Sequence, residues 1–61
     1  MTEKIYFIEN TNALEDALEM LINAFPCFVE REFVEMNFSK ITVRALEINL
    51  ASVERILAPV M

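Results

Sequence analysis

Glutamate is the most abundant side chain in this sequence that could take part in catalysis, and two glutamates are spaced so that they could act together as a catalytic pair. Glu30 and Glu32 are two residues apart, so on a strand they would share one face, roughly 6.5–7 Å from each other. Paired carboxylates can carry out general acid–base catalysis. The chain holds nine glutamates in 61 residues and no histidine, so such pairs arise by chance and lack an imidazole base. We therefore expect a protein that is not an enzyme.

The candidate nucleophiles and metal ligands are too few for an active site or a metal centre. Cys27 follows Pro26 and has no imidazole partner, so we expect a small buried hydrophobe rather than a reactive thiol. Ser39 and Ser52 likewise lack a base. One cysteine, one aspartate and no histidine provide neither a structural zinc site nor a calcium loop. Without glycine there is no glycine-rich phosphate loop, and we expect no cofactor.

The carboxylates also form two groups that could act as binding surfaces. One group lies on a predicted helix and the other on a predicted strand; their members are Glu15, Asp16 and Glu19, and Glu30, Glu32 and Glu35. Rigidly spaced negative charge can occupy a site that a partner uses for a phosphate backbone, which is nucleic-acid mimicry. An ordinary solvated surface is the alternative, because Arg31 lies among the strand carboxylates.

The size and composition of the chain favour association with a second copy or with another protein. A single domain of 61 residues buries only about 60% of the surface that its unfolded chain exposes. Its lone cysteine excludes an internal disulfide. The hydrophobic fraction of 56% exceeds the roughly 45–50% of typical domains, which favours burial of apolar surface against a second copy or another protein.

The charge indicates the kind of partner. A net charge of -5 argues against direct binding of nucleic acid and favours either a basic protein partner or simple solubility. The longest apolar runs are far shorter than the roughly 20 residues that span a bilayer. Acidic and polar residues also interrupt the N-terminal segment, so it does not resemble a signal peptide. We expect a cytoplasmic protein without a membrane partner.

The first half of the chain predicts a strand and a helix. Residues 4–8 are apolar on both faces, which is typical of a strand inside a sheet or covered on both sides. Residues 12–25 predict a helix with Asn12 as N-cap and Glu15 placed almost as in a capping box. Pro26 disfavours helix in the residue before it and so ends the helix.

That helix has more apolar surface than one sheet face requires. Its polar residues occupy a stripe only about 100° wide on a helical wheel. The surplus apolar residues are either covered by the second helix or form a dimer or partner interface; they are Leu14, Leu18, Ile22 and Phe25.

The second half predicts a strand over residues 40–48, a connection over residues 37–40, and a helix from Asn49 to about Ala58. Residues 27–36 fit a helix with Pro26 at its first position, or a strand whose alternation slips near Phe33, as at a β-bulge. We favour the strand, because the strand that follows needs a neighbour with which to pair.

The predicted fold is therefore a single α+β domain over residues 1–61, of β-α-β-β-α order. Its three-stranded, largely antiparallel sheet carries two helices on one face. This order, with "INAFP" (22–26) and "VERIL" (53–57), resembles the DinI-like family. These are small acidic regulators from bacteria and prophages that bind a DNA recombinase filament. The resemblance implies the fold but assigns no binding residue. In that family the acidic last helix is implied to engage the recombinase, whereas the last predicted helix of this chain carries only one acidic residue, Glu54.

Two functions follow as expectations. The first is a phage-like, non-enzymatic protein-binding module that inhibits or modulates a basic nucleic-acid-binding protein. The alternative is a homodimeric structural or assembly subunit whose interface is the apolar flank of the first helix.

Overall fold

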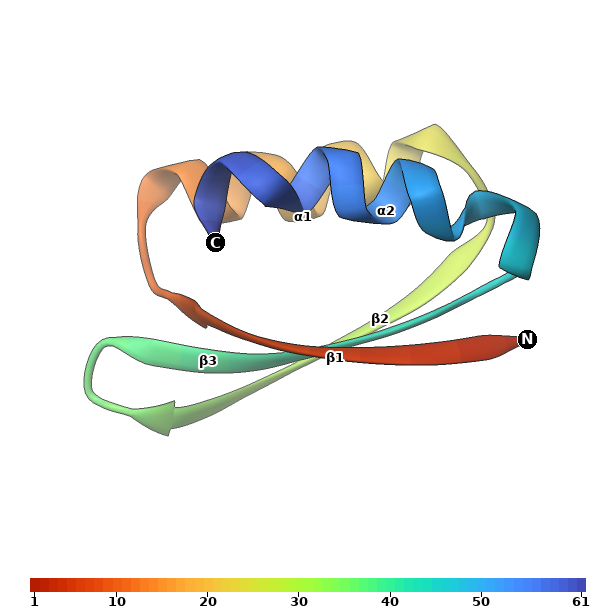
Figure 1. Cartoon of the computed structure of the whole chain (residues 1–61). Coiled ribbons are helices and arrows are strands. Elements are labelled where there is room, and N and C mark those ends of the chain that lie inside the picture. The colour runs from red at the N-terminus through yellow and green to blue at the C-terminus, as the bar shows by residue number, and fades with distance from the viewer.

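A computed structural model describes residues 1–61 as two layers, a sheet and a pair of helices (Figure 1). The elements are β1 (Thr2–Glu9), α1 (Asn12–Ala24), β2 (Cys27–Glu35), β3 (Phe38–Ala45) and α2 (Leu50–Leu57), with short 3-10 helices η1 (Glu47–Asn49) and η2 (Ala58–Val60) on either side of α2. The predicted α+β class and β-α-β-β-α order are confirmed. Neither α1 nor α2 has the length and apolar composition needed to cross a membrane.

The sheet is antiparallel throughout and has the order β1-β3-β2. The central strand is therefore β3, while β1 lies at an edge and pairs only with β3, from Thr2 opposite Ala45 to Glu9 opposite Phe38. The prediction that the first strand lies inside the sheet or is covered on both sides is wrong. Both helices lie on one side of the sheet, so its other side is open (Figure 1).

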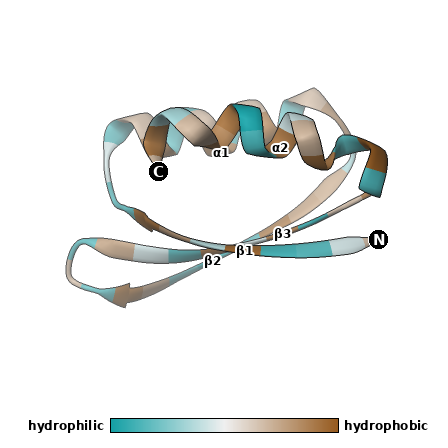
Figure 2. Cartoon of the chain, viewed as in Figure 1, coloured by the Kyte–Doolittle hydropathy of each residue, from teal (hydrophilic) through white to brown (hydrophobic).

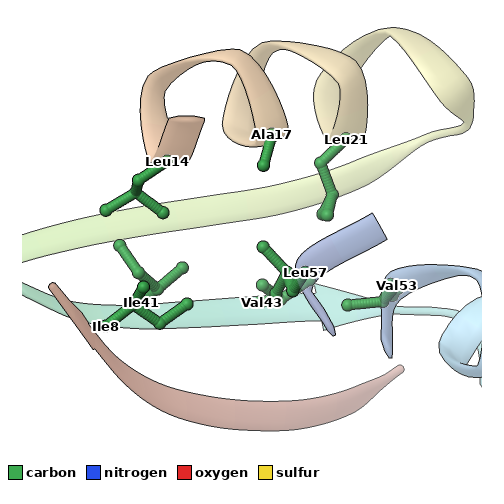
Figure 3. Close-up of a cluster of buried hydrophobic side chains, with 9 residues drawn as sticks. Ile8, Leu14, Ala17, Leu21, Ile41, Val43, Val53 and Leu57 are labelled. Carbon is green, nitrogen blue, oxygen red and sulfur yellow. The ribbon is translucent and has the colours of Figure 1, made fainter. Parts of the chain in front are cut away.

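The core lies between the helices and the covered side of the sheet, where side chains from both layers point toward one another (Figure 3). Its nine buried residues are Ile8, Leu14, Ala17, Leu21, Ile41, Val43, Ala45, Val53 and Leu57. Alternate residues of β3 are buried, as are residues three or four apart in α1, so each element contributes one face. Full burial of one such aliphatic side chain stabilises the fold by about 1.5–3 kcal/mol.

The segment from Cys27 to Glu35 is a strand, and it contains a bulge. Phe33 lies opposite Ser39 and Glu35 lies opposite Phe38, which leaves Val34 as an extra residue between them. The predicted strand and the predicted slip near Phe33 are both confirmed.

The hairpin between β2 and β3 is tighter than predicted. Its turn consists of Met36 and Asn37, because β3 begins at Phe38 rather than at residue 40. No residue in the chain has a positive φ, so this turn does not use the left-handed conformations that favour glycine. The adjacent bulge increases the local twist of the strands.

Helix α1 begins at a different cap from the one predicted. The backbone N–H of Leu14 donates to Oγ1 of Thr11 (3.1 Å), so Thr11 is the N-cap and Asn12 is already helical. The shift of one residue moves Glu15 out of the capping-box position. At the other end Phe25 is extended before Pro26, as predicted. Asn49 precedes α2 but makes no side-chain cap.

Candidate functional site: an open sheet face

The side of the sheet that faces away from the helices presents a regular array of apolar and charged side chains. We call this surface the open face. Strand alternation and the pairing register place the same side outward in all three strands. The open face consists of Glu3, Ile5, Phe7 and Glu9 from β1, Phe38, Lys40, Thr42 and Arg44 from β3, and Phe28, Glu30, Glu32, Val34 and Glu35 from β2.

Large apolar side chains are exposed on this face. Phe7 is 65% exposed and Phe28 is 62% exposed, and Ile5, Val34 and Phe38 are also exposed. Figure 2 shows hydrophobic segments in the strands as well as in the helices that cover them. A sheet side that faces water is normally polar, and grouped exposed apolar side chains mark interaction surfaces.

A shallow hollow of about 440 Å³ lies on the open face near the hairpin turn. It is lined by Phe7, Val34, Glu35 and Phe38, which come from all three strands. We refer to it below as the hollow.

Negative charge dominates the open face. Five carboxylates and two cations, Arg44 and Lys40, leave it with a formal charge of -3. Arg44 on β3 ties the two outer strands together, with its guanidinium 3.0 Å from Glu3 and 3.5 Å from Glu30. The hydrogen bond to Glu3, with the charges of Glu30 and Glu3, raises the pKa of Arg44.

Three carboxylates of the open face remain without an ion pair within 4.0 Å: Glu9, Glu32 and Glu35. Lys40 lies beside Glu32 in the register but does not approach it within that distance. These carboxylates can therefore pair with cations from another molecule.

The predicted acidic groups do not form one surface. Glu30, Glu32 and Glu35 share the open face, whereas Glu15, Asp16 and Glu19 lie exposed on α1, in the other layer. Glu15 is also engaged within the chain, because it forms an ion pair with Arg31. The strand group alone has the spacing expected of a charged row.

Arg31 does not lie among the strand carboxylates, contrary to the sequence expectation. Its side chain extends toward the helix layer and donates to Oγ of Ser39 (3.1 Å), to Oδ1 of Asn10 (2.9 Å) and to Glu15. Ser39 is fully buried, and its hydroxyl donates to Asn10. This network joins β2, β3, the start of α1 and the connection between β1 and α1, where Asn10 lies.

The predicted apolar flank of α1 is mostly covered. Leu14 is fully buried in the core, so it does not belong to any exposed surface. Leu18 and Phe25 are half-buried against the core, and only Ile22 remains exposed. Most of the surplus apolar residues therefore complete the core of the chain itself.

Two further polar side chains are partly buried in the covered layer. The thiol of Cys27 lies 3.7 Å from the carbonyl oxygen of Leu21, and burial raises its pKa, which lowers the thiolate fraction at neutral pH. The buried hydroxyl of Tyr6 has no hydrogen-bond partner; burial and the charge of Glu54 raise its pKa. No three carboxylate or thiol side chains gather as a metal site would require.

The chain matches no family model, no curated protein and no solved structure. The DinI-like resemblance thus stays a prediction from the sequence, and the candidate site rests on its own geometry.

The apolar residues of the open face were not predicted as a site. Their signal was the two-sided apolar pattern of the first strand, with Ile5 and Phe7 on one side. That pattern predicts a strand inside the sheet or covered on both sides, whereas β1 lies at an edge and the two helices cover one side only (Figure 1).

Proposed function

We propose that this chain is a non-enzymatic protein-binding module whose open face binds a basic partner protein. The observation that carries the proposal is the exposure of five large apolar side chains among three unpaired carboxylates on one sheet face. Apolar contact supplies affinity, while the charges select partners with complementary potential and speed their encounter.

A second copy of the chain fits this face less well than a basic protein does. Two open faces packed together would bring two charges of -3 into contact, and like-charge contact is costly at an interface. The homodimeric alternative through the first helix also loses support, because Leu14 is buried and Leu18 and Phe25 are half-buried.

The proposed partner is a nucleic-acid-handling protein. Such proteins carry the basic surfaces that phosphate neutralisation requires, and the row of Glu30, Glu32 and Glu35 complements such a surface. Binding there would inhibit or modulate the partner by competing with its nucleic acid. The proposed compartment is the cytoplasm, where a free thiol such as Cys27 stays reduced.

The test compares two charge-reversed variants in affinity capture from the native host. Glu30→Lys with Glu32→Lys changes the open face, and Asp16→Lys with Glu19→Lys makes the same change in net charge on α1. We expect the wild type and the α1 variant to retain one nucleic-acid-binding protein and the open-face variant to lose it. The purified partner should then bind nucleic acid less tightly when the wild-type chain is added.

Two outcomes contradict the proposal. Equal loss of capture in both variants indicates attraction by net charge alone. Undiminished capture by the open-face variant places the binding surface elsewhere.

A further inference from the structure

The hollow combines aromatic walls with unpaired negative charge. In the register, Phe38 is flanked by Glu9 on β1 and by Glu35 on β2, and Phe7 lies one row away on the same face. Phe7, Phe38 and Glu35 all line the hollow, and neither Glu9 nor Glu35 has an ion pair. Building on the function proposed above, we infer that the hollow receives an arginine side chain of the partner.

Arginine suits these walls better than other side chains do. Its guanidinium is planar and weakly hydrated, so it stacks on aromatic rings and also forms paired hydrogen bonds with a carboxylate. Its methylene groups can lie along an apolar wall such as Val34. The lysine ammonium is a compact, strongly hydrated charge that gains less from the same surroundings.

The cations of the chain itself leave the hollow free. Arg44 lies toward the other end of the open face and is bound to Glu3 and Glu30. Arg31 extends to the helix side, where its guanidinium carbon lies 4.6 Å from the centroid of the Phe33 ring. Lys40 neighbours Phe7 in the register but does not line the hollow.

The bulge in β2 brings Glu35 to the hollow. In an unbroken strand, residues 30, 32 and 34 would face outward and residue 35 would face the helices. The extra residue at Val34 shifts this alternation, so that Glu35 lies opposite Phe38 and joins Val34 on the open face. Bulges commonly redirect side chains next to functional sites.

Titration of the full chain with two short peptides tests this inference. The probes are capped hexa-arginine and capped hexa-lysine, which have equal charge, and binding is followed by amide chemical shifts. We expect the largest shifts at Phe7, Val34, Glu35 and Phe38, and about fivefold tighter binding of the arginine peptide.

Three variants locate the effect. Glu35→Gln should weaken hexa-arginine binding about fivefold, whereas Glu19→Gln removes the same charge from α1 and should leave it unchanged. Phe7→Leu keeps an apolar exposed side chain but removes a ring, so it should reduce the preference for arginine over lysine. The amide spectrum of each variant verifies that it is folded.

The inference is overturned by equal affinity for the two peptides, by equal weakening in both glutamate variants, or by no shifts at millimolar peptide. If that happens while partner capture still depends on Glu30 and Glu32, only the arginine assignment fails. If partner capture is also insensitive to those residues, the proposed function fails with it.

Discussion

At the scale of single residues, Arg31 contributes chiefly to stability. Its side chain is only 20% exposed, and its hydrogen bonds satisfy the buried hydroxyl of Ser39 and the side chain of Asn10. Loss of a partner from a buried polar group costs about 1–3 kcal/mol. The open face does not include Arg31, so partner binding should not depend on its charge directly.

We therefore expect Arg31→Ala to lower the free energy of unfolding by about 1–3 kcal/mol, because it leaves the buried Ser39 hydroxyl without its donor and removes one of the two donors to Asn10. Urea unfolding followed by circular dichroism measures this change. The control is Arg55→Ala, which removes an exposed arginine without an ion pair and should change stability by no more than about 0.5 kcal/mol. Equal losses in the two variants would contradict a structural role for the network.

At the scale of elements, the N-cap of α1 allows the contributions of two neighbouring residues, Thr11 and Asn12, to stability to be compared. Thr11 accepts the hydrogen bond from the N–H of Leu14, whereas Asn12 is the first helical residue. Thr11→Ala should cost about 1 kcal/mol of unfolding free energy, since loss of an N-cap typically costs that much. Asn12→Ala should be neutral or slightly stabilising, because alanine has the higher helix propensity. The same urea measurement decides between them, and a larger loss at Asn12 would restore it as the cap.

The sequence predicted those elements that depend on local signals. Pro26 stops α1, and the slip in alternation at Phe33 appears as a bulge. Strand order was not predictable in this way, because the central place of β3 depends on pairing between Thr2–Glu9 and Phe38–Ala45, which are distant in the chain. The site could not be predicted for the same reason. The exposure of Ile5 and Phe7 follows from the position of β1 at the sheet edge and from the helices, which cover only one side of the sheet.

At the scale of the whole molecule, only part of the apolar content enters the small core, and some of the remainder lies on the open face. The core holds nine residues, while Phe7, Phe28 and Phe38 remain exposed on the other side of the sheet. The high hydrophobic content of the sequence predicts burial against another molecule, and the open face offers apolar surface for such burial.

Self-association should accordingly depend on salt. At an ionic strength of about 0.01 M the Debye length is about 30 Å, and at about 1 M it is about 3 Å, so high salt removes the repulsion between two open faces. We expect light scattering to show a monomer at low salt and weak association at high salt. Phe28→Thr should reduce that association, because it removes exposed apolar surface from the open face.

The matched control is Ile22→Thr, since Ile22 is exposed to a similar extent, 59% against 62% for Phe28, but lies on α1. It should leave the association unchanged. Loss of association in Ile22→Thr instead of Phe28→Thr would favour the helix as the dimer interface.

The edge position of β1 has a further consequence for dynamics. This strand is hydrogen-bonded to one neighbouring strand only, so we expect its detachment to be a local opening that needs less free energy than global unfolding. Detachment also removes Phe7 from the hollow. A ligand in the hollow therefore binds only the closed state and should slow amide hydrogen exchange along β1 as its concentration rises above Kd. Amides in the last turn, Ala58–Val60, open without disturbing the hollow and should keep their exchange rates, so the N-terminal strand would report occupancy of the site.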